Sequence, residues 1–375
     1  MRIGILCHAT YGGSGVVAAE LGKQLAGRGH QVHFITVGRP FRLGNYLPNI
    51  YIHEAAAFNY PLFEAPPYFL TQVNKTVEVL RCCQLDVLHA HYAVPHSLGA
   101  LLARQVAGRP VPVVTTLHGT DTSLVGARRE FYDLTRYSLE ASDMVTAVSA
   151  FLAEQSRQTF NFQRELPVLY NFVDTRVFRP EAAVEKQQLT GGRDLLIHIS
   201  NFRPLKRVLD VIRVFQLVCK QRPACLLMIG DGPEMPAAQE LAASLGLHRD
   251  ILFLGQQDTV APLLAAADVM LLPSCCESFG LAALEALACG VPVVASRAGG
   301  LPEVVVHGQV GFLTAVGDLA EMARFTLLLL EDRALRQKMS AHARSRAVEK
   351  FNAAYWVAKY EQLYQTVIDQ YCGRV

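Results

Sequence analysis

The chain has 375 residues, of which 51% are hydrophobic and 18% are charged, and its formal net charge is +2. This length exceeds that of one ordinary domain and predicts two domains. A charge so close to zero argues against a nucleic-acid-binding stripe and against a polybasic membrane surface. The longest apolar runs, such as Val269–Pro273 and Phe325–Leu330, are far shorter than a membrane span. We therefore expect neither a nucleic-acid partner nor stable membrane insertion.

The N-terminal residues and the cysteines favour a cytoplasmic location. Residues Met1–Leu6 lead directly into fold-like sequence, so they predict a first strand and not a signal peptide. The nine cysteines include two adjacent pairs and no C-x-x-C spacing, which predicts neither a disulfide frame nor a zinc site. We expect most of them to be buried as small hydrophobic side chains.

Short apolar, β-rich runs alternate with helical stretches along almost the whole chain, a pattern typical of parallel sheets with crossover helices. In the first half the predicted strands are Arg2–Leu6, Gln31–Thr36, Val87–His91, Val113–Leu117 and Met144–Val148. In the second half they are Leu195–Ser200, Cys225–Gly230, Ile251–Gly255, Val269–Pro273, Val291–Ser296 and Gly311–Leu313. The predicted fold class is therefore α/β.

This alternation divides into two Rossmann-like halves. We predict an N-terminal domain over residues 1–171, a C-terminal domain over residues 172–352, and a C-terminal helix over residues 353–375 that packs back toward the N-terminal domain. Residues Pro180–Arg193 are polar and contain Gly191-Gly192, which indicates a linker or a frayed helix. Two such domains facing each other would place the carboxyl ends of both sheets on a shared cleft, where ligands of these sheets bind.

A glycine-rich loop follows the first predicted strand. Gly13, Ser14 and Gly15 begin the pattern G-x-G-x-x-A, which taken literally is a dinucleotide fingerprint. An NAD site also needs an acidic residue at the end of the second strand, and Thr36–Pro40 has none. Arg39 in that segment leaves NADP open as an alternative. The glycines in any case allow the backbone to approach a ligand at a helix start.

Histidines follow two other predicted strands of the first half. His89 and His91 alternate along a strand, but no carboxylate or cysteine completes a set of metal ligands, so we predict no metal there. A core histidine with satisfied hydrogen bonds is the expected role of His89. His118 precedes Gly119 and short polar residues, so it is better placed to face a ligand.

In the second half, Arg203, Lys206 and Arg207 follow a predicted strand. Cations at the carboxyl edge of a sheet are typical of a clamp for phosphate charge, and the alternative is a solvated basic loop. The segment Gly230–Glu234 follows the next strand and predicts a tight turn with a structural role.

Two glutamates, Glu277 and Glu285, stand eight residues apart around a small-residue turn. The turn predicts a helix start, whose unpaired N–H groups suit a diphosphate, while a carboxylate can accept bonds from ribose hydroxyls. A helical spacing of at most about 12 Å on different faces does not suit a glycosidase pair, which flanks a single bond. The pattern predicts a nucleotide-sugar site, and the alternative is an amphipathic helix with two surface glutamates.

Together, the E-x7-E element, the His118–Asp121 turn, the glycine-rich first loop and the basic loop after Ser200 resemble the family 4 glycosyltransferases of the two-domain GT-B fold. The resemblance covers essentially the full length. Further sequence segments most resemble the branch of this family that joins N-acetylglucosamine to L-malate in bacillithiol synthesis. These segments are Gly12–Val17, Pro40–Leu43, His91–His96, Thr116–Asp121, Tyr170–Asp174 and Ile199–Arg203.

The resemblance implies a retaining hexosyltransferase that moves N-acetylglucosamine from UDP-N-acetylglucosamine (UDP-GlcNAc) to the hydroxyl of L-malate. The donor-binding residues that it implies are Gly13, Ser14, Gly15, Asn201, Arg203, Lys206, Glu277, Phe279, Gly280, Leu281 and Glu285. The implied catalytic residues are His118, Arg203, Lys206 and Glu277. The candidate acceptor-binding residues are Ser14, Tyr92, Thr120 and Arg42. No cofactor is expected, and nothing in the sequence implies Mg²⁺.

The same resemblance implies how these residues act. Arg203 and Lys206 would neutralise the leaving diphosphate, and Glu285 would hold the ribose. Glu277 and the backbone of Phe279–Leu281 would hold the sugar. His118 would orient the donor beside the anomeric carbon without acting as a base, since the departing phosphate oxygen takes the acceptor proton. Many relatives carry the phosphate-binding arginine five residues before the lysine, where this chain has Asn201.

Other readings of the sequence stay open. Within the class, the alternative is a family 4 transferase with a UDP-sugar donor and a glycan or lipid acceptor, although the basic amphipathic surface of membrane-bound members is not evident. A nucleotide-sugar epimerase shares the two-sheet plan, and an NADP oxidoreductase shares the first fingerprint. UDP release that requires an added acceptor would exclude both. The sequence leaves the oligomeric state open, a homo-oligomer included.

Overall fold

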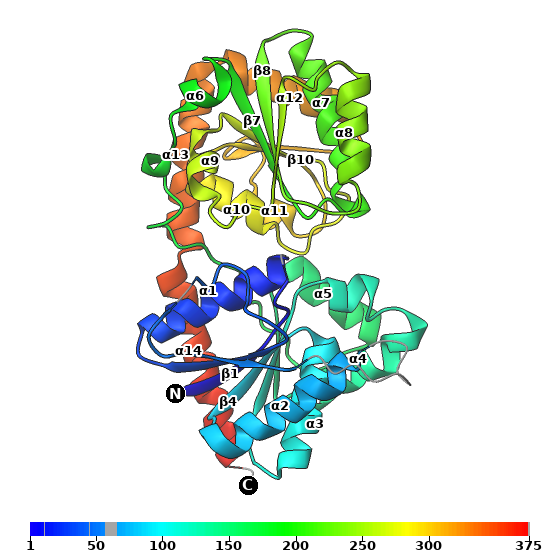
Figure 1. Cartoon of the computed structure of the whole chain (residues 1–375), viewed down its shortest axis with the longest axis vertical. Helices are drawn as coiled ribbons and strands as arrows, with labels where there is room; N and C mark the ends of the chain where they lie inside the picture. Colours follow the sequence, from blue (N-terminus) through cyan, green and yellow to red (C-terminus); the bar gives the residue numbers. More distant parts are fainter. Residues whose placement is uncertain (11, 45, 57–65, 374–375) are drawn as a thin grey trace. The chain divides into compact units, whose positions relative to one another are not determined.

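The computed structural model describes residues 1–10, 12–44, 46–56 and 66–373 and divides into two compact units. Unit 1 contains residues 1–171 and 354–375, and unit 2 contains residues 172–353. Figure 1 shows that the last helix, α14 (Ala353–Cys372), runs beside the sheet of unit 1. Among the described helices, none has both the length and the apolar character needed to cross a membrane.

Unit 1 is built on a six-stranded parallel sheet in the order β3-β2-β1-β4-β5-β6. Its strands are β1 (Arg2–Leu6), β2 (Gln31–Thr36), β3 (Ile50–Glu54), β4 (Val87–His91), β5 (Val113–Leu117) and β6 (Met144–Ala147). Its other helices are α1 (Gly13–Gly27), α2 (Tyr68–Cys83), α3 (Leu98–Ala107), α4 (Arg129–Ala141) and α5 (Ala150–Phe160), with short turns η1 (Ala93–Ser97) and η2 (Thr120–Leu124). Helices α2 and α3 pack together over a core shared with β4 and β5.

Unit 2 repeats this plan with a sheet in the order β12-β11-β10-β7-β8-β9. Its strands are β7 (Asp194–Ile199), β8 (Ala224–Ile229), β9 (Ile251–Gly255), β10 (Val269–Leu272), β11 (Val293–Ser296) and β12 (Gly311–Thr314). Its α-helices are α6 (Lys186–Thr190), α7 (Val208–Cys219), α8 (Met235–Ser244), α9 (Ala261–Ala266), α10 (Leu281–Ala288), α11 (Leu301–Val304), α12 (Leu319–Glu331) and α13 (Arg333–Lys350), and its 3₁₀ turns are η3 (Pro180–Ala182) and η4 (Pro204–Lys206).

Burial explains why these runs form strands. Every residue of β4, β5, β8 and β10 is buried, as expected for central parallel strands covered on both faces by helices. Three helices begin at side-chain caps, where Ser149, Asp318 and Asp332 each accept a hydrogen bond from a backbone N–H in the first turn. The buried strands and the capped helix starts therefore each have a local cause in the sequence.

All eleven predicted strands are confirmed, with ends that differ by at most two residues. The twelfth strand, β3, was not predicted. It lies at the edge of its sheet with an exposed or half-buried residue at every position, so its sequence carries no apolar run. Within Pro180–Arg193, predicted as a linker or frayed helix, the structure forms η3 and α6.

The cysteines differ from expectation. All nine are free thiols, but only Cys7, Cys225 and Cys289 are buried. The prediction that most are buried is therefore wrong. Cys82 and Cys372 lie at the exposed ends of helices and Cys275 lies in a loop, where a small side chain is not enclosed by packing.

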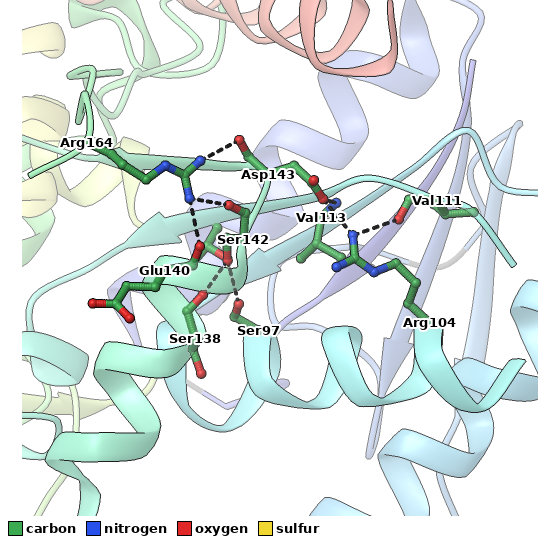
Figure 2. Close-up of polar contacts among 10 residues, drawn as sticks. Ser97, Arg104, Val111, Val113, Ser138, Glu140, Ser142, Asp143 and Arg164 are labelled. Atoms are coloured by element: carbon green, nitrogen blue, oxygen red, sulfur yellow. Dashed lines mark hydrogen bonds and ion pairs between the residues drawn. The ribbon is translucent and has the colours of Figure 1, made fainter. Parts of the chain in front are cut away.

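A polar network joins α3 to the start of β5 and to the turn between α4 and β6 (Figure 2). Asp143 Oδ2 accepts hydrogen bonds from Arg104 Nη1 at 2.7 Å and from Val113 N at 2.8 Å. Arg164 donates to the carbonyls of Glu140, Ser142 and Asp143. The network lies at the amino ends of β5 and β6 and stabilises the fold there. The loops at the carboxyl ends of the strands lie at the opposite edge of the sheet.

Candidate active site

The strand order of each unit reverses at one point along the sheet. In unit 2 the reversal falls between β7 and β10, and in unit 1 it falls between β1 and β4. Ligands of doubly wound sheets bind beside such a reversal, at the carboxyl ends of the strands. The loops that follow β7 and β10 hold the basic segment and the first glutamate of the E-x7-E element, so sheet order brings two separate sequence motifs together.

The contact between these two loops is an ion pair. Lys206 Nζ lies 2.6 Å from Glu277 Oε1, and Ser274 Oγ donates to the same oxygen at 2.9 Å. The side chains of Lys206 and Glu277 are only 18% and 13% exposed, so water screens the pair weakly. A backbone bond from Cys275 N to Leu205 O at 2.9 Å also ties the loops together.

His198 stabilises the start of the loop after β7 through two hydrogen bonds. Its Nδ1 lies 2.8 Å from the carbonyl oxygen of Leu271, which can only accept, so Nδ1 carries the proton. Nε2 must then accept from Ser200 Oγ at 2.8 Å. Burial lowers the pKa of His198 to about 4, and the neutral ring therefore persists at physiological pH. This contact fixes where the basic loop leaves the sheet.

Arg203 and Asn201 lie in the same loop. Among the residues that the structure describes, Arg203 is exposed and has no ion-pair partner, which leaves its guanidinium available to a ligand. Arg207 differs, because it pairs with Asp210 at 2.5 Å. Asn201 Oδ1 is buried without a hydrogen-bond partner in the described part of the chain. Such an acceptor suits a hydroxyl or N–H group of a ligand, and not a phosphate oxygen.

Helix α10 begins directly after the loop that carries Glu277. Gly280 precedes the helix in a left-handed conformation, with a φ of 99°, and no side chain caps the first turn. Phe279 is 2% exposed and packs its ring edge-on to Phe351 at 5.7 Å. Glu285 lies within α10 and is 4% exposed. This excludes the alternative of two surface glutamates on an amphipathic helix.

Sequence reasoning missed the glycines that support these loops. A Cβ at Gly299 would lie 2.0 Å from Glu277 O, and a Cβ at Gly300 would lie 2.4 Å from Ser278 O. Gly300 N also donates to Glu277 O at 2.8 Å. The only sequence signal was a glycine pair shortly after the strand 293–296, at the same edge of the sheet.

Gly230 has the corresponding role beside the basic loop. Its φ is 125°, and a Cβ there would lie 1.7 Å from Ser200 O. Glu234 N donates to Phe202 O at 3.0 Å, which binds the turn to the same loop. The structural role predicted for Gly230–Glu234 is thus confirmed.

In unit 1, aromatic rings gather at the carboxyl ends of β1, β4 and β5. Tyr92 has a φ of 99° and places its ring centroid 5.5 Å from His118 and 5.2 Å from His8. His118 Nε2 lies 2.9 Å from His91 Nδ1, so the two imidazoles share one proton. The structure therefore brings two predicted residues, His118 and Tyr92, side by side.

Asp121 fixes the turn that carries His118. Its carboxylate accepts hydrogen bonds from the backbone N–H groups of Ala93, His118 and Gly119 at 3.1, 3.2 and 2.8 Å. Burial raises the pKa of Asp121 to about 6, although the three hydrogen bonds from the backbone lower it. One carboxylate thus joins the loops after β4 and β5. Thr120 begins η2, the turn that follows β5.

His89, His91 and His96, which are buried, and His118, which is half-buried, are neutral near pH 7. Burial lowers the pKa of His89 and of His118 to about 3, and lowers those of His91 and His96 well below the ordinary value. His118 is therefore suited to orienting a substrate through a neutral N–H or ring nitrogen, and not to carrying a positive charge.

His89 has the core role predicted for it. It is fully buried, and its Nε2 and Nδ1 lie 2.7 Å from Thr116 Oγ1 and 2.7 Å from Tyr364 Oη. A neutral imidazole satisfies both contacts by donating to one hydroxyl and accepting from the other. Because Tyr364 belongs to α14, this bond attaches the C-terminal helix to the central strand β4.

The remaining predicted residues of unit 1 lie at the start of α1 and in the segment after β2. Ser14 and Gly15 are in the first turn of α1, and a Cβ at Gly15 would lie 2.7 Å from His8 O, so α1 begins against the loop that carries His8. Gly13 is the first residue of that helix. Arg42 follows β2 with a φ of 63°, and its carbonyl accepts from Lys23 Nζ at 3.2 Å. No contact between the described residues joins Arg42 to His118.

Two sequence families match the chain, one over each unit. Residues 11–177 match Glycosyltransferase Family 4, and residues 181–346 match Glycosyl transferases group 1. Together with the two Rossmann-like sheets, these matches define the class: the chain belongs to the family 4 glycosyltransferases of the GT-B fold. It is a glycosyltransferase enzyme.

The relatives are similar over the full length. The N-acetyl-alpha-D-glucosaminyl L-malate synthase of Bacillus anthracis is 45% identical over 371 residues, which cover 98% of this chain and 97% of that protein. Among solved structures, sucrose-phosphate synthase from Thermosynechococcus elongatus has a TM-score of 0.81 at 21% identity, covering 99% of this chain and 100% of that one. Anabaena HepE in complex with UDP-glucose has a TM-score of 0.79 at 23% identity, covering 98% and 100%.

Proposed function

We propose that this protein transfers N-acetylglucosamine from UDP-GlcNAc to the hydroxyl of L-malate, with retention of the anomeric configuration. The observation that carries the proposal is the 45% identity to the Bacillus anthracis L-malate synthase over 98% of the chain. That alignment spans both units, so it includes the donor residues of unit 2 as well as the acceptor residues of unit 1.

On the donor side, the Lys206–Glu277 pair holds both groups ready for substrate. An incoming diphosphate competes with Glu277 for the ammonium of Lys206, and the released carboxylate can accept hydrogen bonds from sugar hydroxyls. Arg203, exposed in the same loop, adds a second cation. Negative charge grows on the diphosphate as the glycosidic bond breaks, so both cations stabilise the transition state more than the ground state.

Helix α10 contributes the rest of the donor site. In the part of the chain that the structure describes, no side chain caps its first turn, so the N–H groups there can bind phosphate or sugar oxygens. Glu285, one turn further on and almost fully buried, suits the ribose hydroxyls. Each of these contacts positions the donor without taking part in bond breaking.

On the acceptor side, malate brings two carboxylates close to a diphosphate. At 4–6 Å and an effective dielectric constant near 20, each such charge pair repels by about 3–4 kcal/mol. The first turn of α1 with Ser14, together with Tyr92, Thr120 and Arg42, supplies hydrogen-bond donors and one cation. Charge-assisted bonds worth about 1.5–3 kcal/mol each offset the repulsion for a small acid.

The chemical step needs no protein base. The malate hydroxyl oxygen bonds to the anomeric carbon, the bond from that carbon to the phosphate oxygen breaks, and the hydroxyl proton passes to the departing phosphate. His118 remains neutral because burial lowers its pKa to about 3, and it orients the sugar. We also propose that Arg203 and Lys206 replace a metal ion as the counter-charge, so turnover should persist in EDTA and without added Mg²⁺.

Product analysis tests the proposal. Incubation of the protein with UDP-GlcNAc and L-malate should yield N-acetylglucosaminyl-malate and UDP, detected by mass spectrometry. D-malate and inositol phosphate should react much more slowly. Absence of glycosyl-malate together with efficient transfer to a sugar or lipid acceptor would overturn the malate proposal and favour the glycan or lipid alternative.

A further inference from the structure

Three side chains with metal-binding atoms meet at the edge of the unit 1 sheet, away from the loops that carry His118. They are His33 in β2, His53 in β3 and Cys83, the last residue of α2. One nitrogen or sulfur atom from each lies within 4.8 Å of the other two. His33 is 6% exposed, whereas His53 and Cys83 are half-buried and reachable from solvent.

The two imidazoles already face each other through ring nitrogens. His33 Nδ1 lies 2.9 Å from His53 Nε2, and the ring planes differ by 11°. At this distance one nitrogen carries a proton and the other is a bare acceptor, which is the form that binds a metal ion. His33 also stacks on Tyr51 at 4.7 Å, so its ring is held in place before any ligand arrives.

The second ring nitrogen of His33 is also unusual. Nε2 is buried and has no hydrogen-bond partner among the described residues. Among the residues that the structure describes, the His33–His53 contact is thus the one hydrogen bond to this buried ring. A cation that bound both rings would replace a single shared proton.

Cys83 completes a set of two nitrogens and one sulfur. A bound cation displaces the proton of the thiol, as soft metal ions do. Lys75 and Glu78, which pair at 2.6 Å on the same helix, are the charged groups that act on His53. Arg2 and Cys82 act on Cys83 in addition. Of the charged groups that act on the Cys83 thiol, Arg2 favours the thiolate and Glu78 opposes it.

We propose that His33, His53 and Cys83 bind a thiophilic divalent cation of the Zn²⁺ class, with water as the fourth ligand. Tetrahedral zinc sites have Zn–N and Zn–S distances of about 2.0 and 2.3 Å, which separate ligand atoms by about 3.3–3.7 Å. The present separations need small side-chain rotations to reach this geometry. The bound ion joins the edge strand β3 to the end of α2 and stabilises unit 1.

No sequence spacing signals this site. The ligands stand 20 and 30 residues apart, and one of them lies in β3, the strand whose pattern carries no apolar run. Parallel pairing of β2 with β3, in which His33 is opposite Tyr51 and Ile35 is opposite His53, brings the two imidazoles within reach.

Metal titration of the full chain tests the proposal. Metal-free protein titrated with Zn²⁺ by calorimetry should bind one tight equivalent, and the ion should raise the thermal unfolding midpoint. Cys83→Ser and His53→Asn should each weaken that equivalent by at least about tenfold. Cys82→Ser changes the adjacent, exposed cysteine and should bind as the parent does. Co²⁺ in place of Zn²⁺ should give a thiolate charge-transfer band that Cys83→Ser lacks.

Two results would overturn the site. One is equal Zn²⁺ affinity in the parent and in Cys83→Ser, and the other is an equal loss in Cys82→Ser and Cys83→Ser. Circular dichroism of the metal-free variants establishes that they are folded. If His53→Asn fails to fold, the Cys83→Ser and Cys82→Ser pair decides the question, because neither change removes a buried ring.

Discussion

Lys206 and Glu277 show how a single contact can serve two states of the enzyme. In the free protein each satisfies the other's charge at 2.6 Å with little solvent exposure. In the proposed function, ligand binding would exchange this partner for a diphosphate at Lys206 and a sugar hydroxyl at Glu277, so each group would keep a hydrogen-bonding partner. A buried charge without a partner is costly, which makes the exchange favourable over simple exposure.

Lys206→Ala should lower kcat by roughly 10²-fold, because it removes a charge-assisted bond that strengthens as the diphosphate leaves. The variant also leaves Glu277 half-enclosed without its cation, so the thermal midpoint should fall. Arg213→Ala is a matched control, since Arg213 pairs with Asp210 on α7 and is 49% exposed. Steady-state kinetics with UDP-GlcNAc measure the effect, and a normal kcat in Lys206→Ala would remove this residue from the proposed clamp.

Glu285→Ala should weaken UDP binding by about 1–3 kcal/mol, the cost of leaving a ribose hydroxyl without its acceptor in a buried site. Calorimetric titration with UDP measures this directly. Glu321→Ala removes an exposed glutamate from the first turn of α12 and should leave the affinity unchanged. Equal UDP affinity in the parent and in Glu285→Ala would exclude the ribose contact.

At the scale of elements, sequence pattern predicted the strands where burial decides the structure. The fully buried strands β8 and β10 are unbroken apolar runs, β4 and β5 combine apolar residues with His or Thr, and all four were predicted. The edge strand β3, in which every residue is exposed or half-buried, was not predicted. Edge strands depend on backbone pairing with a neighbour more than on apolar burial, and pairing leaves no local trace in the sequence.

For the candidate site, too, local sequence predicted individual residues but not the contacts between them. Lys206, Glu277 and Glu285 were predicted as separate motifs, because charged residues in apolar surroundings stand out. Their pairing depends on β7 lying beside β10, which is a property of strand order and not of local sequence. Gly299 was not predicted, since its role depends on the close approach of a carbonyl 22 residues earlier in the chain.

Gly299→Ala tests how tightly the loops are supported. Its Cβ would lie 2.0 Å from Glu277 O, so the loop that carries Glu277 must move and turnover should fall at least about tenfold. Gly308→Ala is a matched control, because Gly308 has a similar left-handed φ of 77° but nothing within 4 Å of a Cβ. Both variants should lose about 1–2 kcal/mol of stability from backbone strain, and only Gly299→Ala should lose activity. Equal activity in the two would contradict the proposed support.

At the scale of the whole molecule, the chain consists of two copies of one strand order, and the last helix returns to the first unit. The Tyr364–His89 bond places the end of the chain in the core of unit 1, so this unit is completed only when the C-terminal residues are present. The same core contains the buried histidines, and their neutrality gives unit 1 a characteristic dependence on pH.

Acid should destabilise unit 1. In the unfolded chain a histidine has a pKa of about 6.5, whereas burial lowers the pKa values of His89 and His118 to about 3 and those of His91 and His96 well below the ordinary value. Below pH 6.5 the unfolded chain therefore binds protons that the folded unit does not, and stability falls as pH falls toward 3. Asp121 acts in the opposite direction between about pH 4 and 6, because burial raises its pKa to about 6.

With His33 and His53, whose pKa values burial also lowers, six histidines of unit 1 stand against one aspartate. Unfolding near pH 5 therefore takes up at most about five protons, equivalent to at most about 7 kcal/mol per pH unit. Urea unfolding followed at pH 7.5, 6 and 5 should show this decline. His89→Gln retains hydrogen-bonding groups but cannot titrate, so it should reduce the slope by about a fifth. His248→Gln, an exposed histidine of unit 2, should leave the slope unchanged. A stability that is flat between pH 7.5 and 5 would show that these histidines titrate in the folded protein and that the core of unit 1 admits water.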